Sequence, residues 1–212
     1  MRDPAPGRGL RAIALGVAVA VAGSVPAADK SAVKPKWHTP FDLYLDPEEA
    51  YDLKRADPDG VLFIDVRTRP ELEFVGYPGL IDANIPIFLY QGYTWKPSKD
   101  GVHGRFAKRY NPDFVAAVDR LIEIKGKDKS VPIIVMCQSG SRAPIAAREL
   151  HDAGYRQVYT QYQGFEGVKA RDGARAGKRM VNGWKLAGLP WVYGLQAEKM
   201  YFNFEPGAAA AP

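Results

Sequence analysis

Short apolar runs alternate with helical patterns along most of this 212-residue chain. Each run has the length of a strand that is buried on both faces. The runs lie at residues 60–67, 83–90, 131–136 and 157–162. The helical patterns lie at residues 45–57, 69–74, 111–122 and 142–154. This alternation predicts a single α/β domain with a mostly parallel central sheet and helices on both of its faces.

Two of the helical patterns begin with a capping residue followed by proline. Asp46 precedes Pro47, with Glu49 three residues after the cap, and Asn111 precedes Pro112. A polar cap and a proline in the first turn are typical of a helix N-terminus. We therefore expect helices whose first residues are Pro47 and Pro112.

The first 28 residues have the composition of a signal peptide. Arg2, Arg8 and Arg11 form a basic start, and the Ala/Val-rich run 12–22 is followed by small residues that suit signal peptidase. The apolar run is short for a membrane span, although retention as an anchor is the alternative. We expect removal of residues 1–28, no stable membrane span afterwards, and export, to the periplasm if the source is Gram-negative.

The rest of the chain is expected to comprise an N-terminal arm (29–42), the domain itself (43–192) and a C-terminal tail (193–212). Removing the first 28 residues takes away three Arg and one Asp, so the net charge falls from +5 to +3. This mild excess suits small anions, and no Lys/Arg run with interleaved aromatic residues favours nucleic acid as a partner.

Cys137 is the only cysteine and directly follows the third apolar run. An exported chain with one cysteine has no internal disulfide and no resolving thiol of its own. A lone cysteine is often a small buried apolar residue. Cys137 is therefore either well hidden or kept for chemistry.

The loop between this run and the next helix has the sequence Cys-Gln-Ser-Gly-Ser-Arg, residues 137–142. In open parallel sheets, ligands bind beyond the carboxyl ends of the strands. Backbone N–H groups of a tight loop, together with the positive end of the following helix, bind anions and favour a thiolate. Gly140 permits a left-handed turn, and Arg142 is expected either to brace the loop carbonyls or to meet a negative substrate. The pattern predicts an anion-binding nucleophile.

Several segments, in this order, resemble those of rhodanese-like domains: "LFIDVRTRPELEF", "GYPGLIDANIPIF", "VMCQSGSRA", "LHDAGYRQVY" with "QGFEGVKA", and "NGWKLAGLPW". The third matches the active-site loop of the family, Cys-x-x-Gly-x-Arg, and the last is similar to the close of exported single-domain members. The resemblance covers about Asp46 to Trp191.

The resemblance implies a sulfurtransferase in which Cys137 takes a sulfane sulfur from a small anionic donor such as thiosulfate. The resulting persulfide passes its sulfur to a thiol or to cyanide, and no metal or organic cofactor is implied. Arg142 is the second catalytic residue, and Asp65 and Arg67 are expected near the base of the loop, where they help to hold it. The persulfide is stabilised by backbone N–H groups of the loop, those of Gln138, Ser139, Gly140, Ser141 and Arg142.

Other conspicuous residues receive no catalytic role. Tyr77 stands near a position where many family members have histidine, and His103 is expected to be a surface residue of a long loop, residues 91–110. Three tryptophans are expected to pack rather than to line a pocket. They are Trp95, Trp184 and Trp191. Asp65 has an alternative role as a cap on nearby backbone.

Two other functions are weighed against this one. Phosphatases and arsenate reductases of related folds have five residues between cysteine and arginine, whereas here there are four, and Met136 stands where tyrosine phosphatases have histidine. A sulfur-carrier or sensing module would work with a dedicated partner protein. The partner would dock on residues 91–110 or on Lys169–Arg179, although the composition of Lys169–Arg179 favours a solvated loop over a docking site. The physiological donor and acceptor and the oligomeric state are left open.

Overall fold

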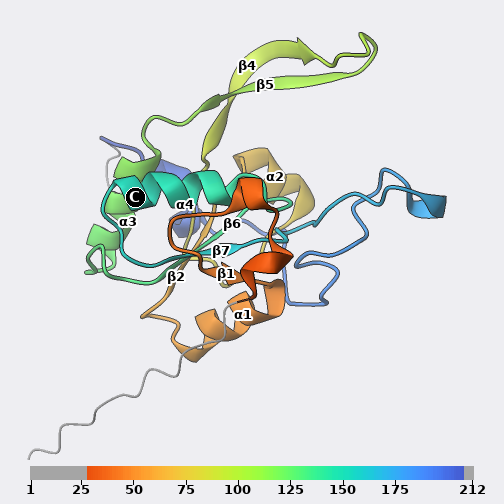
Figure 1. The fold of residues 1–212 in the computed structure, drawn as a ribbon. Helices are drawn as coiled ribbons and strands as arrows, with labels where there is room; N and C mark the ends of the chain where they lie inside the picture. Colours follow the sequence, from red (N-terminus) through yellow and green to blue (C-terminus); the bar gives the residue numbers. More distant parts are fainter. Residues whose placement is uncertain (1–27, 208–212) are drawn as a thin grey trace, which may run out of the picture.

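The computed structural model describes residues 28–207, so the expected signal peptide lies outside the described part except for Ala28. Figure 1 shows a central sheet between helices, with two long excursions. The strands of the sheet are β1 (Tyr44–Leu45), β2 (Leu62–Asp65), β3 (Ala83–Asn84), β6 (Ile133–Met136) and β7 (Val158–Gln161). The helices are α1 (Pro47–Ala56), α2 (Arg69–Val75), α3 (Phe114–Ile124) and α4 (Ala143–Asp152). Strands β4 (Phe88–Pro97) and β5 (Gly104–Tyr110) form a separate two-stranded sheet.

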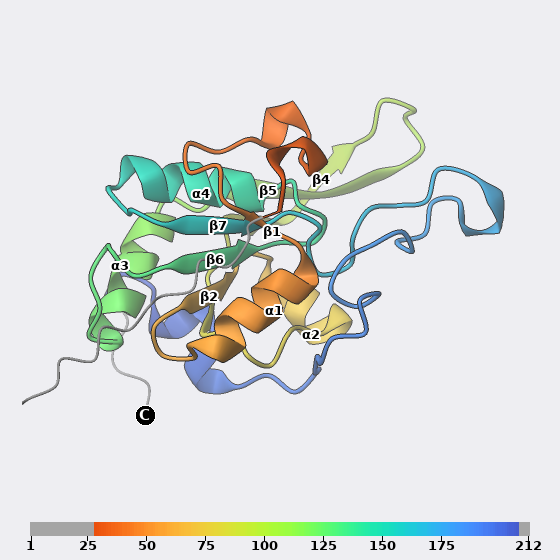
Figure 2. The ribbon, with the colours of Figure 1, turned by 60° about the horizontal axis from the view of Figure 1, so that its bottom comes forward.

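The five strands of the main sheet are parallel, in the order β1-β7-β6-β2-β3. Helices α3 and α4 pack on one face of the sheet, and α1 and α2 pack on the other (Figure 2). Each face of the sheet has one apolar cluster between it and its two helices. The expected α/β architecture with a parallel sheet is confirmed. Strand β6 lies between β7 and β2, so the residue that follows it emerges at the middle of the carboxyl edge of the sheet.

Helix α1 begins as expected, but α3 does not. Asp46 caps α1 through a complete capping box with Glu49. Helix α3 begins two residues later than expected, at Phe114. The Asn111 Oδ1 atom accepts from the Asp113 N–H at 3.2 Å, as a capping residue does, while its Nδ2 atom donates to Pro86 O and to the Tyr201 hydroxyl.

The expectation of one strand at residues 83–90 followed by a loop at 91–110 is wrong. Strand β3 ends at Asn84, the chain continues past Pro86, which has no N–H to donate, and a β-hairpin begins at Phe88. Most of the hairpin is exposed on both sides, so no apolar alternation marks its strands in the sequence.

The C-terminal segment returns to the main domain. Met200, Tyr201 and Phe204 are buried, and the Tyr201 side chain pairs with Asn111, 90 residues earlier. These residues belong to the apolar core although the sequence suggested a tail. Within residues 28–207, no helix combines the length and the apolar character needed to cross a membrane.

Candidate active site

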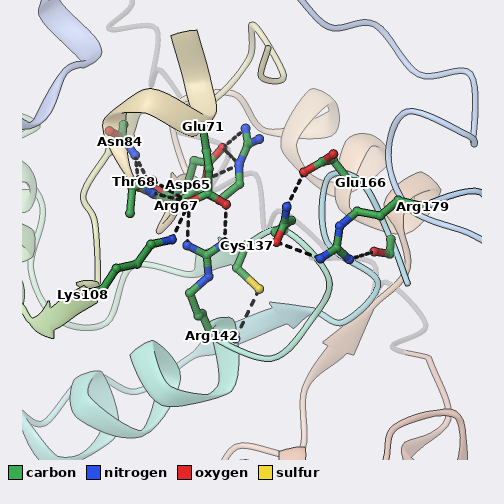
Figure 3. Close-up of polar contacts among 12 residues, drawn as sticks. Asp65, Arg67, Thr68, Glu71, Asn84, Lys108, Cys137, Arg142, Glu166 and Arg179 are labelled. Carbon is green, nitrogen blue, oxygen red and sulfur yellow. Dashed lines mark hydrogen bonds and ion pairs between the residues drawn. The ribbon is translucent and has the colours of Figure 1, made fainter. Parts of the chain in front are cut away.

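Cys137 lies directly after β6, at the start of the loop that leads into α4. Its sulfur accepts the Arg142 N–H at 3.3 Å, so the loop closes on itself around Sγ (Figure 3). The residue has no exposed surface and also touches the apolar cluster beneath α4. The structure therefore places the thiol after the buried strand, as the sequence predicts. Ser141 in the same loop is exposed, so the buried thiol lies close to the surface of the protein.

A glycine-rich turn at residues 163–167 binds the carbonyl groups of this loop. The N–H of Phe165 donates to Cys137 O at 2.7 Å, and those of Glu166 and Gly167 donate to Gln138 O at 2.9 and 3.0 Å. Because the turn takes the carbonyl oxygens, they do not compete for the anion-binding side of the loop.

The backbone N–H groups of the loop are left available. Within residues 28–207, none of those from Gln138 to Ser141 has an acceptor at hydrogen-bond distance. Consecutive free N–H groups beside a helix N-terminus bind and stabilise anions. Of the five expected donors, the Arg142 N–H is at hydrogen-bond distance from Sγ, and those of Gln138, Ser139, Gly140 and Ser141 lie in the same loop without an acceptor among the described residues.

Gly140 is required by this shape. Its φ is +81°, and a Cβ atom at this position would overlap the carbonyl oxygen of Tyr162. Both the backbone conformation and the close approach exclude a side chain there.

Arg142 does not brace the loop carbonyls, contrary to one of the two expectations for it. Its guanidinium instead forms two hydrogen bonds with Glu71 of α2, from Nη1 to Oε2 at 2.8 Å and from Nη2 to Oε1 at 2.5 Å. Glu71 also accepts from the N–H and the hydroxyl of Thr68, as the third residue of a capping box. A bidentate pair of this kind fixes the orientation of the arginine beside the thiol.

Glu71 was not among the residues expected in the site. Its spacing from Thr68 marks it as a helix-capping residue, but nothing local indicates a partner 71 positions later. Burial by itself raises the pKa of Glu71, yet the hydrogen bonds and charge of Arg142 outweigh burial and lower the pKa to about 2. Lys108 of β5 adds a second cation, 3.8 Å from Glu71 Oε2. The carboxylate is therefore ionised at neutral pH.

Asp65 and Arg67 form a fully buried ion pair at the end of β2. The Arg67 Nε and Nη2 atoms donate to Asp65, and Nη2 also donates to Gly76 O at 2.9 Å. The guanidinium stacks on the Phe165 ring, with 4.2 Å from Cζ to the ring centroid. Phe165 belongs to the turn that binds Cys137 O, so the pair supports the loop through this turn. Asp65 is also opposite Met136 in the sheet, adjacent to Cys137.

The side chain of Gln138 links the loop to two charged residues. Its Nε2 donates to Glu166 at 2.6 Å, and its Oε1 accepts from Arg179 Nη2 at 3.0 Å. Arg179 is the last residue of the basic segment 169–179, so this segment contacts the loop at one point (Figure 3).

The remaining residues singled out in the sequence lie away from the thiol. Tyr77 is buried and donates to Gly194 O, and His103 pairs with Asp100 at the exposed tip of the hairpin. The three tryptophans pack as expected. Trp184 lies in the core, Trp191 packs on Phe165, and Trp95 packs on Phe106 of the hairpin.

A family model of the rhodanese-like domain matches residues 46–171 of this chain. The match covers more than half of the sequence and includes the loop, the turn at residues 163–167, and Asp65, Arg67 and Glu71. The chain belongs to the rhodanese-like domain family.

This rhodanese-like protein is similar to several known proteins. The uncharacterized protein RC0915 of Rickettsia conorii is 31% identical over 145 residues, which are 68% of this chain and 93% of that protein. Rhodanese-like domain-containing protein 9, chloroplastic, of Arabidopsis thaliana is 25% identical over 161 residues, 71% of this chain and 65% of that protein.

Two solved structures are also similar to it. The crystal structure of Rv0390 from M. tuberculosis is 26% identical, with a TM-score of 0.48, over 71% of this chain and 97% of that one. The solution structure of a polysulfide-sulfur transferase homodimer from Wolinella succinogenes is 22% identical, with a TM-score of 0.39, over 70% and 77%.

The loop of this rhodanese-like protein suits a sulfur anion. Four residues separate Cys137 from Arg142, and the charged groups near Sγ are held by hydrogen bonds. Within residues 28–207, no group of three or more His, Cys, Asp or Glu side chains is placed to hold a metal ion. A cavity of about 450 Å³ lined by Lys54, Asp82, Lys125 and Lys199, among others, contains no residue of the loop and lies by the amino ends of the strands.

Proposed function

We propose that this rhodanese-like protein is a sulfurtransferase, which moves a sulfane sulfur from thiosulfate or a related anionic donor to a thiol or cyanide through a persulfide on Cys137. The observation that carries the proposal is the arrangement of the loop. The thiol accepts the Arg142 N–H at the N-terminus of α4, and within residues 28–207 the N–H groups of residues 138–141 in the same loop have no acceptor, so the loop favours a negative charge on sulfur.

The reaction has two displacement steps. The Cys137 thiolate attacks the outer sulfur of thiosulfate, the sulfur–sulfur bond of the donor breaks, and sulfite leaves with the electron pair. The product is a persulfide anion on Cys137. A thiolate or cyanide then attacks the terminal sulfur, the Cys137 Sγ–S bond breaks, and the thiolate of Cys137 is restored.

The loop would stabilise the same charge in both steps. Backbone donors fixed before the reaction stabilise an anion without having to reorganise. The Arg142 guanidinium adds positive charge beside Sγ, and Glu71 holds it in place. We propose Cys137 and Arg142 as catalytic residues and Asp65, Arg67 and Glu71 as positioning residues.

Burial of the thiol favours a second candidate function. Cys137 has no exposed surface, so a donor reaches Sγ only after the loop or its cover moves. A sulfur carrier opened by a dedicated partner protein would have this property and show little turnover with free small molecules.

Mass spectrometry of the mature protein before and after treatment with thiosulfate tests the proposal, with Cys137→Ser as the control. We expect one added sulfur atom on the Cys137 peptide, removed by cyanide or a thiol, and none on the variant. Sulfur added by polysulfide but not by thiosulfate would retain the Cys137 persulfide and assign it to a donor other than thiosulfate. Absence of added sulfur with both donors would overturn the sulfurtransferase proposal.

A further inference from the structure

Two excursions of the chain project beyond the carboxyl edge of the sheet, where the Cys137 loop lies (Figures 1 and 2). The hairpin arm comprises residues 88–110, that is, β4, β5 and their turn. The basic arm comprises residues 168–182, which leave the glycine-rich turn and return to it through the pairing of Lys169 with Arg179. Neither arm contributes to the main sheet or to its core clusters beyond Phe88 and Leu89 at the hairpin base.

The arms concentrate the positive charge of the protein. Together they contain ten Lys and Arg residues and two Asp residues, a net charge of +8, whereas the whole chain has +5. The remainder therefore has a net charge of −3, so the excess of positive charge lies on the two arms. The field of this charge steers an acidic macromolecule toward the site.

The hairpin arm also exposes large aromatic side chains. Tyr93 is 93% exposed, Trp95 53% and Phe106 50%. Aromatic residues and arginine are enriched at the centres of protein–protein interfaces, where they provide most of the binding energy.

A cleft lies at the base of each arm. The cleft at the hairpin base, about 390 Å³, includes Arg69 and Arg109 in its lining. The cleft at the base of the basic arm, about 410 Å³, includes Lys34, Lys169 and Arg171. The first lining also contains Glu73 and the second contains no acidic residue, so both linings have a net positive charge that suits acidic side chains of a partner.

Each arm touches the site at one point. Lys108 of the hairpin arm lies 3.8 Å from Glu71, which holds Arg142, and Arg179 of the basic arm donates to Gln138 of the loop. A protein bound across both arms is therefore held over the Cys137 loop.

We propose that the hairpin arm and the basic arm form a docking surface for an acidic protein, and that a thiol of this protein exchanges sulfur with Cys137. The inference rests on the proposed sulfurtransferase function and identifies the class of acceptor. A protein is favoured over nucleic acid or a membrane because it offers a thiol for the reaction and acidic side chains for the two clefts.

Two synthetic peptides of equal length test this proposal, each with a single cysteine. One has Asp and Glu around the cysteine, and the other has Asn and Gln at the same positions. We expect the persulfidated protein to transfer sulfur to the acidic peptide roughly tenfold faster or more, with an advantage that falls as salt is added. Equal rates for the two peptides would overturn the proposal.

Charge-reversal variants assign the effect to the arms. The hairpin-arm variant carries Lys96→Glu, Lys99→Glu and Arg105→Glu, and the basic-arm variant carries Arg171→Glu, Arg175→Glu and Lys178→Glu. All six residues are exposed, and among the described residues no hydrogen bond joins any of them to the loop. Each variant should lose most of the preference for the acidic peptide while transferring sulfur to cyanide at an unchanged rate.

A control variant has the same charge change on three other exposed residues, Arg55→Glu, Arg120→Glu and Lys127→Glu. This control should keep the preference for the acidic peptide, and loss of the preference in it would contradict a role for the arms.

Binding to the Cys137→Ser protein separates this proposal from the chemistry. Fluorescence anisotropy of the labelled acidic peptide measures docking even if Cys137 accepts no sulfur, so failure of the sulfurtransferase proposal leaves this measurement intact. We expect tighter binding of the acidic peptide than of the neutral peptide. Tighter binding of an RNA oligonucleotide of equal charge, or of vesicles of anionic phospholipid, would assign the surface to another class of ligand and overturn the proposal.

Discussion

Glu71 and Arg142 form a nearly buried ion pair that joins α2 to the start of α4 beside Cys137. The carboxylate neutralises part of the positive charge of the guanidinium and sets its orientation. Truncating one member of such a pair is costly because the other is left buried without a partner. The pair is therefore expected to matter both for stability and for the shape of the site.

Replacing Glu71 with Gln is predicted to lower the free energy of unfolding by on the order of 3 kcal/mol at neutral pH. Because Arg142 lowers the pKa of Glu71 to about 2 in the folded protein, the stabilisation is fully present above the ordinary pKa of a glutamate. It is lost as the pH falls from about 4.3 toward 2. Urea unfolding at several pH values measures this difference between the wild type and the variant.

Glu73→Gln is the matched control, since Glu73 is in the same helix but exposed. This variant should change stability by less than about 0.5 kcal/mol at every pH. Parallel curves for wild type and Glu71→Gln between pH 7 and the acid range would contradict the assigned role of the pair.

Gly140→Ala is predicted to destabilise the protein more than Gly126→Ala does. Both glycines have positive φ, which costs an alanine about 1–2 kcal/mol, but a Cβ atom at residue 126 meets open space. At residue 140 it overlaps Tyr162 O, so the loop must move as well. Denaturant unfolding of the two variants compares the costs, and equal costs would show that the loop relaxes freely.

At the scale of the elements, the β4–β5 hairpin differs from the main sheet. Its two strands pair with each other around an irregular register between Tyr90 and Trp95, and only its base packs against the core. Strand β6, in contrast, is buried along its full length. Local opening needs little free energy where few apolar contacts are lost.

Backbone amides of residues 91–107 are predicted to exchange with deuterium orders of magnitude faster than those of β6. Protection should increase from the tip toward Phe88, which packs on the core. Hydrogen-exchange mass spectrometry measures this gradient. Equal protection of the hairpin and β6 would show that the hairpin opens only with the whole domain.

At the scale of the whole molecule, the C-terminal segment completes the core beside α3. Phe204 is 3% exposed within the larger apolar cluster, whereas Phe202, two residues earlier, is 46% exposed. Residues beyond the expected end of the domain thus contribute to its stability.

Phe204→Ala is predicted to lower the free energy of unfolding by about 3 kcal/mol or more, because it removes a buried ring and leaves a cavity. Phe202→Ala makes the same chemical change at an exposed position and should cost less than about 1 kcal/mol. Thermal or urea unfolding of the two variants gives the comparison. A small cost for both would show that the segment is not part of the folded core.

The sequence by itself determined the α/β architecture, the position of the single thiol after a buried strand, and the glycine that its loop requires. Each of these features is set by residues that are neighbours along the chain. Apolar runs of strand length alternate with helices that begin at a cap and a proline, and a residue without a side chain stands in a tight turn. The same local signals predicted the start of α1 correctly.

Only the tertiary structure decided which residues distant in the chain meet around the thiol and in the core. Glu71 and Arg142 meet across 71 residues, Asn111 and Tyr201 across 90, and Gln138 and Arg179 across 41. No apolar alternation marks the hairpin in the sequence, because its strands are exposed on both sides, and the buried partners of the Asn111 side chain lie 25 and 90 residues away in the chain. Such contacts form when separate elements pack together, so no local pattern encodes them.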